Sequence, residues 1–559
     1  MHLIERRKCL RGRYSCTRKR DGRHKARIVA QDLKSFGRAE AKDVYAATPA
    51  FMSIRLLLAA APCHTHNIHT TDFDTAYLQG SAHPNGKRVL FKLWDGATKS
   101  FTLYWLTGYI YGEQPAGRNW KDTLSGTLEN DMDFTEAKNA PSMYYRESDG
   151  TRLSVFVDDP LVTTKKPSLG ETDVKDKFYQ DLKQRFDIKD IKTLGGDQVI
   201  DYLSMRISTD ASGETTVCNP EFIDQMVRKA GLEGCNPVKN AITKDLLKEI
   251  ASEVELEMFV GPEEITKFQS TMGDINWLAQ TTHPDVAVAV SQLAKRCVKP
   301  TPACLKAAKH VIRYLSGRRA YGFKYGTGDG SGLVVWTDSD CAGTHAIDGE
   351  QRSRMGITVR YNGFIVGWIT KLIPGIMVSS GEAEIYALSE AIRIALHMKY
   401  VGEELGIEVP DEVPIMCDAK VAIAFAENTI GVGRMKHLDL RAGWIRQMKD
   451  GKGVKLIKVP GPENDSDFFT KILPQCEFRK KVDSMVQRID EVGEAMVSEP
   501  ARGHGDIQNS DGSARVTAKY QKRADASSED AEGCAVVGYG EARLFGGSVN
   551  ADMMRNAQK

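Results

Sequence analysis

Length is the feature that most constrains what this chain can fold into. Its 559 residues far exceed the roughly 100–200 residues that usually share one core, so we expect three or four folding units. The sequence contains no apolar run of about 18 or more residues that would span a bilayer, and no charged-then-apolar leader. These features predict a protein of the cytosol or the nucleus that is not secreted and has no membrane partner.

The cysteines and the charge distribution narrow the class of protein further. The eleven cysteines are scattered singly, which is typical of reduced, mostly structural cysteines. The net charge is only +2, but the first 27 residues hold eleven Lys or Arg against Glu5 and Asp21. Such a block can neutralise phosphates, and it is equally typical of a solvated terminus or a nuclear-import sequence.

The first half of the chain shows local patterns of helices and strands. Positions 51–61 are typical of a buried helix, and TDFDTAYLQG at 71–80 has the composition of a strand entering a turn. LSVFVDD at 153–159 is apolar up to two aspartates, and Pro160 separates it from an apolar stretch at 161–164, which predicts a hairpin. Further helices are predicted at 172–188 and 221–232, with two or three more within 263–316.

A glycine-rich break at 330–332 precedes a second kind of pattern. Strands alternate with helices after it, which predicts an α/β domain with a hairpin-rich first half. The predicted strands are 333–337, 355–361, 364–370, 414–417 and 454–459, and the predicted helices are 380–408, 418–427 and 438–450. From about residue 485 the hydrophobic periodicity fades into Gly, Ser, Asp, Glu and Ala, so we expect 485–559 to be largely disordered.

Three aspartates in the first half form a candidate metal site. Asp72 is predicted at a strand end, and Asp158 and Asp159 at the hairpin tip. Mg²⁺ prefers carboxylate and phosphate oxygens, so a few aspartates on neighbouring strands are suited to a pair of ions for phosphoryl transfer. Two adjacent aspartates are also what an ordinary solvated hairpin tip contains.

Five segments give this site its context. They are KARIVA at 25–30, SIRLLLAAA at 53–61, TDFDTAYLQG at 71–80, IYGEQPAGRNW at 110–120 and FVDD at 156–159. In this order they resemble the successive motifs of copia-type reverse transcriptases. The resemblance implies that Asp72, Asp158 and Asp159 are catalytic metal ligands. It also implies that Tyr77 packs under the incoming sugar and discriminates against a 2′-hydroxyl.

The same resemblance suggests further substrate-binding residues. They are Lys25 and Arg27, for the triphosphate, together with Gly112 and Gly117 of the middle motif. Ordinary surface cations remain an equally good interpretation of the two basic residues. The chain also departs from the family pattern at four positions, without touching the three aspartates: Glu113, Pro115, Phe156 and Pro160.

Four separated acids form a second candidate site. Asp338 and Asp418 are predicted at strand ends, Glu384 in a helix and Asp467 near the C-terminal end of the domain. This order resembles the ribonuclease H fold, which implies that all four carboxylates are catalytic ligands of two Mg²⁺. Copia-like segments at 352–356, 362–370 and 434–441 support the resemblance. Asp340 and Glu382 remain alternatives to Asp338 and Glu384, and His437 is interpreted as structural or substrate-orienting.

Together these patterns predict an α+β and α/β multidomain fold. The resemblance implies a right-hand fingers-palm polymerase fold, followed by a connection region and a ribonuclease H-like α/β domain. The predicted units are a basic segment at 1–24, fingers and palm at 25–210, thumb and connection at 211–330, the ribonuclease H-like domain at 331–484 and a tail at 485–559.

The resemblance implies a reverse transcriptase with ribonuclease H activity, using two Mg²⁺ per site, for which Mn²⁺ could substitute. Its partners would be an RNA template, a DNA primer, the RNA–DNA hybrid and deoxynucleoside triphosphates. Two alternatives stay open: an inactive retrotransposon remnant that at most binds nucleic acid, and a chain with an active ribonuclease H and a dead polymerase.

Overall fold

The computed structural model describes residues 9–18, 24–32, 44–86, 88–96, 98–168, 173–196, 198–427 and 439–489. All of them lie within one compact unit, Met1–Val492. Much of the basic N-terminal block, His437 and the predicted tail from residue 490 onward lie outside the described residues. No helix in the described part of the chain is both long and apolar enough to cross a membrane.

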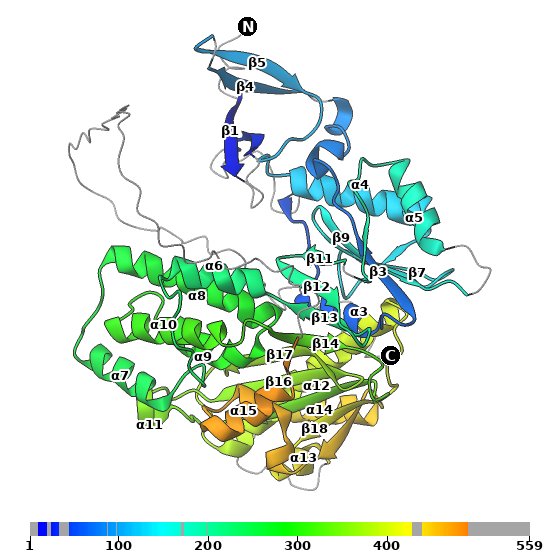
Figure 1. Cartoon of the computed structure of the whole chain (residues 1–559). Coiled ribbons are helices and arrows are strands. Elements are labelled where there is room, and N and C mark those ends of the chain that lie inside the picture. The colour runs from blue at the N-terminus through cyan, green and yellow to red at the C-terminus, as the bar shows by residue number, and fades with distance from the viewer. Residues whose placement is uncertain are drawn as a thin grey trace, which may run out of the picture. The chain divides into compact units, whose positions relative to one another are not determined.

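The fold is a mixed α+β arrangement of several units (Figure 1). The first described sheet has the strand order β2-β1-β4-β5. Its strands are β1 (Leu10–Arg18), β2 (His24–Ala30), β4 (Val89–Asp95) and β5 (Ser100–Leu106). Leu10, Ala30, Phe91 and Leu93 form a small core on one of its faces. We call this unit the fingers sheet.

The second sheet carries the predicted hairpin and has the order β10-β3-β9-β8-β7-β6. Its strands are β3 (His66–Thr70), β6 (Thr135–Glu136), β7 (Met143–Arg146), β8 (Thr151–Phe156), β9 (Asp159–Lys165) and β10 (Lys192–Thr193). Side chains alternate across β9: Leu161 packs in the same core as helix α3 (Phe51–Ala59), whereas Val162 packs with α4 (Ala116–Asp131) and α5 (Val174–Lys183). The hairpin and the helices at α3 and α5 are confirmed.

The predicted strand at 71–80 is wrong. The strand lies earlier, at His66–Thr70, and the aspartate-containing segment after it forms a turn and a short 3₁₀ helix, Ala76–Gln79. Aspartate and threonine favour turns through hydrogen bonds to nearby backbone. The Phe73 N–H donates to the Asp158 carbonyl at 3.1 Å, which holds this turn against the hairpin tip.

A third sheet and a helical cluster occupy the middle of the chain. The sheet has the order β11-β12-β13-β14-β20, with strands at Ile200–Tyr202, Met205–Thr209, Thr215–Cys218, Tyr321–Tyr325 and Gln487–Arg488. The helices, which share one core and lie side by side in Figure 1, are α6 (Pro220–Lys229), α7 (Lys244–Glu255), α8 (Pro262–Thr281), α9 (Ala287–Ala294) and α10 (Pro302–Ser316). The helices predicted at 221–232 and within 263–316 are confirmed, whereas α7 and this sheet were not predicted.

The fourth sheet matches the α/β pattern predicted after residue 332. Its order is β17-β16-β15-β18-β19, with strands at Phe364–Leu372, Arg354–Tyr361, Leu333–Ser339, Val413–Cys417 and Val454–Lys458. Its helices are α12 (Ser380–Glu404), α13 (Lys420–Ala426), α14 (Asp439–Asp450) and α15 (Gln475–Asp483). The β15 and β18 strands are parallel, with Thr337 opposite Cys417, so the residues that follow these positions emerge at the same edge.

Helix α3 packs directly against this fourth sheet and joins the two halves of the described chain. The buried Arg55 Nε donates to the Val366 carbonyl at 2.8 Å, and its Nη1 donates to the Gln280 carbonyl at 2.7 Å. Its guanidinium lies 4.0 Å from the centre of the Trp368 ring. Burial lowers the pKa of Arg55 to about 10. The division into units at 25–210, 211–330 and 331–484 stays a prediction.

We expect Arg55→Ala to lower the free energy of unfolding by about 3 kcal/mol, because it leaves buried carbonyl acceptors unpaired and opens a cavity. Chemical denaturation of the full chain measures this loss. Arg479→Ala is the matched control, since this side chain is 79% exposed and should change stability by about 0.5 kcal/mol or less. Equal effects of the two substitutions would show that Arg55 does not hold the halves together.

Candidate active sites

The first candidate site lies where β3 ends beside the β8–β9 hairpin. Thr70 is opposite Leu161, so Asp72 follows β3 at the same edge where Asp158 and Asp159 enter β9. Burial and the neighbouring Asp72 raise the pKa of Asp158, and burial, Asp158 and Asp72 raise that of Asp159 to about 6. The structure therefore brings the three predicted aspartates into electrostatic contact.

The hairpin tip has a strained backbone. Val157 has a φ of 62°, which is unfavourable for a β-branched residue. The Trp120 indole on α4 donates to the Val157 carbonyl at 2.7 Å and holds this conformation. The middle motif, which includes Trp120, thus positions the two aspartates that follow Val157.

The departures from the family pattern fit the local structure. Val155 is opposite Pro160, but the Val155 N–H donates away from β9, to the Ser142 carbonyl at 2.9 Å. The pair is therefore a non-hydrogen-bonded one, and the missing N–H of Pro160 removes no bond between β8 and β9. Pro115 is the N-cap of α4, and the buried Glu113 accepts a hydrogen bond from the Ile110 N–H at 3.0 Å.

The predicted substrate-binding residues gather around Asp158. The Tyr77 ring lies 4.8 Å from the Tyr111 ring, and the Arg27 guanidinium lies 4.9 Å from the centre of the latter. Arg27 and Lys25 both act on Asp158 electrostatically and oppose the rise of its pKa. These contacts place β2 of the fingers sheet beside the aspartates.

The two predicted glycines differ in what the close approach requires of them. A Cβ on Gly112, which has a φ of +89°, would lie 2.1 Å from the Ala30 carbonyl oxygen of β2, so a side chain is excluded there. A Cβ on Gly117 would lie 3.6 Å from the Tyr77 hydroxyl, in ordinary contact. Gly112 is therefore needed for backbone packing, whereas a small side chain at position 117 would fit beside Tyr77.

Lys189 was missed by the sequence analysis. Its ammonium pairs with the Asp72 carboxylate, and its N–H donates to the Asp72 carbonyl at 2.9 Å. The other Asp72 carboxylate oxygen, Oδ1, is buried and has no hydrogen-bond partner. A lysine in a polar loop after α5 gave no signal in the sequence, because only the turn geometry brings it to Asp72.

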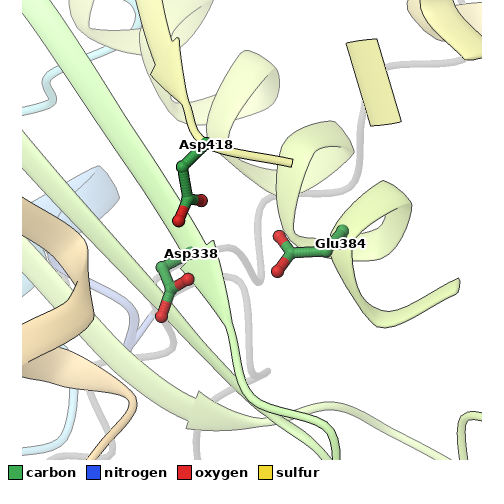
Figure 2. A group of neighbouring side chains, drawn as sticks. All are labelled: Asp338, Glu384 and Asp418. Atoms are coloured by element: carbon green, nitrogen blue, oxygen red, sulfur yellow. The ribbon is translucent and has the colours of Figure 1, made fainter. Parts of the chain in front are cut away.

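The second candidate site is more compact. Asp338 on β15, Glu384 on α12 and Asp418 just after β18 each place a carboxylate oxygen within 4.8 Å of the other two (Figure 2). Helix α12 packs on β15, which brings Glu384 over the edge where the two strands end. Among the described residues, this is the set of acidic, His or Cys side chains that could hold one metal ion.

Electrostatics at this site favour a bound cation. Burial together with the neighbouring Asp467 and Asp418 raises the pKa of Asp338 to about 7, although Lys471 and Thr470 oppose the rise. Burial, Asp338 and Asp418 raise the pKa of Glu384 to about 8. The Glu384 Oε2 atom is buried and has no hydrogen-bond partner. Three carboxylates with an unpaired oxygen fit a hard divalent cation such as Mg²⁺.

The structure does not bring Asp467 into this group of oxygens. Asp467, in the 3₁₀ helix Asp465–Phe469, pairs with Lys471, whose ammonium is also 3.5 Å from the Asp338 Oδ2 atom. A lysine therefore lies between the fourth predicted acid and the first. The two alternative acids have other roles: Asp340 accepts the Arg354 N–H, and Glu382 accepts the Val378 N–H near the start of α12.

Three residues of this site were not predicted. The Asn464 amide donates to Asp418 Oδ1 at 3.1 Å and to the Thr337 carbonyl at 2.9 Å, and the Thr470 hydroxyl donates to Asp338. Lys471 is the third. All three lie within a few residues of Asp467. The sequence analysis therefore selected the right segment but predicted a role only for its acidic residue.

We expect Glu384→Gln to stabilise the metal-free protein. The raised pKa of Glu384 means that the folded protein favours the protonated side chain. Its contribution to the free energy of unfolding is therefore complete below the ordinary pKa of 4.5 and is lost as pH rises towards about 8. The variant should therefore gain about 1–3 kcal/mol over wild type in EDTA at pH 8, and less at pH 5.

Unfolding curves at both pH values, with EDTA and with Mg²⁺, measure this difference. Mg²⁺ should reduce the difference in free energy of unfolding between the variant and wild type, because a bound cation stabilises the wild-type site. Glu403→Gln, on the exposed side of the same helix, is the control and should show no pH-dependent gain. A gain that does not depend on pH would contradict the assignment of the effect to Glu384 ionisation.

The chain is similar to several known proteins. Residues 2–244 match the family described as reverse transcriptase (RNA-dependent DNA polymerase). The retrovirus-related Pol polyprotein from transposon TNT 1-94 of Nicotiana tabacum is 26% identical over 472 residues, covering 82% of this chain and 34% of the relative. The one from transposon RE1 of Arabidopsis thaliana is 24% identical over 462 residues, covering 82% of this chain and 30% of the relative.

The chain thus spans about a third of the length of these two relatives. A solved structure of the foamy viral protease-reverse transcriptase in complex with double-stranded DNA is 11% identical, with a TM-score of 0.47. It covers 80% of this chain, which covers 65% of the solved one.

Proposed function

We propose that this chain, which is similar to copia-type retrotransposon Pol proteins, copies an RNA template into DNA and degrades the RNA of the resulting hybrid. The polymerase would use Asp72, Asp158 and Asp159, extending a DNA primer with deoxynucleoside triphosphates. The ribonuclease H would use the second site. Each site would take two Mg²⁺, for which Mn²⁺ could substitute.

The observation that carries the ribonuclease proposal is the convergence of Asp338, Glu384 and Asp418 within 4.8 Å. These residues would hold Mg²⁺, which supplies Lewis-acid activation of water and neutralises charge on the scissile phosphate. Asn464 restrains the Asp418 carboxylate through its 3.1 Å bond, and Thr470 restrains that of Asp338. Lys471, 3.5 Å from Asp338, adds a positive charge close to where a phosphate would lie.

In the polymerase, the chain's own residues orient the nucleotide. Tyr77, whose ring lies next to that of Tyr111, would pack against the sugar, and Arg27 and Lys25 would pair with the triphosphate. Trp120 keeps the strained hairpin tip in place, so that Asp158 and Asp159 stay beside Asp72. The bound cations would offset the mutual repulsion that raises the pKa of Asp159.

One observation favours the second candidate, an active ribonuclease with a dead polymerase. In the described chain the polymerase aspartates do not form a carboxylate group as compact as that of the ribonuclease site, and the Asp72 carboxylate pairs with Lys189. A pre-formed ion pair of this kind competes with a metal ion for the same oxygen.

Both candidates are tested by incubating the full chain with Mg²⁺, deoxynucleoside triphosphates and a DNA primer on an end-labelled RNA template. Primer extension reports the polymerase, and shortening of the RNA reports the ribonuclease. The full proposal expects both signals, abolished by EDTA. Cleavage without extension would establish the second candidate, and neither signal from well-folded protein that binds the hybrid would leave only an inactive remnant.

A further inference from the structure

The chain enters and leaves the β4–β5 hairpin through two segments, and a buried histidine and glutamate face each other between them. The segment before β4 carries His83, and the segment after β5 carries Glu113. These residues are only 5% and 8% exposed, and the His83 Nε2 atom lies 4.0 Å from the Glu113 Oε2 atom. We call the two segments, residues 80–86 and 107–115, the neck of the hairpin.

Backbone contacts also tie the two segments of the neck together. Ala82 forms an isolated antiparallel bridge with Gly108, and the His83 N–H donates to the Thr107 carbonyl at 3.0 Å. The His83 ring lies 4.2 Å from the Tyr109 ring. His83 therefore fastens the segment before β4 to the segment after β5 through both its backbone and its side chain.

Glu113 closes a turn within the second segment. Its Oε1 atom accepts the Ile110 N–H at 3.0 Å, and its own N–H donates to the Ile110 carbonyl at 3.2 Å. Burial of a carboxylate is costly unless its oxygens have partners. Here one oxygen accepts a backbone N–H and the other faces His83. These partners explain why the neck tolerates an acid at one of the positions where the chain departs from the copia-type pattern.

The turn that Glu113 closes leads to the predicted nucleotide-binding residues. The Tyr111 carbonyl accepts the Ala30 N–H of β2 at 2.7 Å. The Tyr111 ring lies 4.8 Å from the Tyr77 ring and 4.9 Å from the Arg27 guanidinium. Because Glu113 sets the conformation of the turn that contains Tyr111, it also sets the position of the ring that contacts Tyr77 and Arg27.

We propose that Glu113 and His83 are positioning residues for the incoming nucleotide, an inference that rests on the proposed polymerase function. By fastening the neck, they hold Tyr111 where its ring supports Tyr77 and Arg27. A binding site keeps its geometry only when supporting residues fix its side chains. Loss of the pair should therefore weaken nucleotide binding and leave the binding of primer–template duplex unchanged.

The test measures nucleotide affinity without catalysis. The full chain is bound to an RNA template whose DNA primer ends in a dideoxynucleotide, and the matching deoxynucleoside triphosphate is titrated with Mg²⁺ present. A fluorescent base in the template reports binding. We expect Glu113→Leu to raise the nucleotide Kd about tenfold or more, while the Kd for primer–template stays within about twofold of wild type. Glu129→Leu is the matched control, because it makes the same change at an exposed acid of α4.

Two further variants separate the two partners of Glu113. Glu113→Gln keeps an oxygen for the Ile110 N–H but loses the charge that faces His83, so it should raise the nucleotide Kd only about threefold. His83→Leu should have a similar effect. The double variant His83→Leu/Glu113→Gln should bind the nucleotide as tightly as either single variant, because each substitution alone already breaks the pair.

Hydrogen exchange gives a second readout on the nucleotide-free protein. The Ile110 N–H loses its acceptor in Glu113→Leu, so peptides that cover residues 107–113 should exchange faster in this variant than in wild type. Exchange of the same peptides in Glu129→Leu should match wild type.

Three results would overturn the inference. They are a nucleotide Kd in Glu113→Leu that equals that of Glu129→Leu, an equal loss of primer–template binding, and additive losses in the double variant. Because the nucleotide is bound without being incorporated, the inference and the proposed function fail separately. A wild-type protein that binds the nucleotide but does not extend a primer contradicts the function, whereas unchanged binding by Glu113→Leu in a protein that extends primers contradicts only the inference.

Discussion

Asp418→Asn is expected to reduce RNA cleavage about 10³-fold or more while primer extension continues at the wild-type rate. Asp418 contributes one of the three oxygens that converge with those of Asp338 and Glu384, and an amide has no negative charge to hold a cation. A 10³-fold loss corresponds to about 4 kcal/mol of transition-state stabilisation. Single-turnover cleavage of an RNA–DNA hybrid, with extension scored in the same reaction, measures both rates.

Glu463→Gln is the control for this variant. Glu463 is an exposed acid in the 3₁₀ helix Gly461–Glu463, one residue from Asn464, which bonds Asp418. The Glu463→Gln variant should cleave RNA at the wild-type rate. That result would show that loss of a nearby charge alone does not cause the cleavage defect of Asp418→Asn. Equal loss of extension in Asp418→Asn would instead indicate a global defect.

Asp158→Asn is expected to have the opposite selectivity, with extension reduced about 10³-fold or more and cleavage unchanged. Asp158 lies at the hairpin tip and interacts with both Asp72 and Asp159. The substitution removes one of three charges that would hold Mg²⁺ there. It should also lower the pKa of Asp159, because Asp158 is the largest of the charges that raise it after burial. Steady-state extension on an RNA template measures the rate, and thermal unfolding checks the fold.

Asp133→Asn is the control for this variant. Asp133 is exposed and has a φ of 59°, a backbone conformation that Asn adopts readily, so the same chemical change should be silent there. Full extension by Asp158→Asn would remove the polymerase assignment from this hairpin, whatever happens to cleavage.

Local patterns predicted the elements that carry the second site, and the resemblance to the ribonuclease H fold selected its acids. Asp338, Glu384 and Asp418 were each predicted at a strand end or within a helix, and the strands and helices formed within a few residues of the predicted bounds. Such predictions succeed because the period of apolar residues reports burial along one element at a time. The β8–β9 hairpin was predictable for the same reason, since its apolar runs stop at two aspartates and a proline.

Contacts between distant segments were not predictable. Lys189 beside Asp72, Lys471 between Asp338 and Asp467, and Arg55 against Trp368 each involve residues that give no periodic signal. That Pro160 removes no hydrogen bond between β8 and β9 could not be inferred either, because it depends on which way the Val155 N–H points in the sheet.

The sequence by itself determined the order of the elements, because that order is encoded by neighbouring residues whose periodicity acts locally, and the resemblance to a known family singled out the candidate acids. Only the tertiary structure decided which acids meet, which lysines pair with them and which face of the fingers sheet is exposed. Those outcomes depend on strand register and on packing between segments far apart in the chain, and a shift of one residue in register would turn every side chain of a strand to the other face.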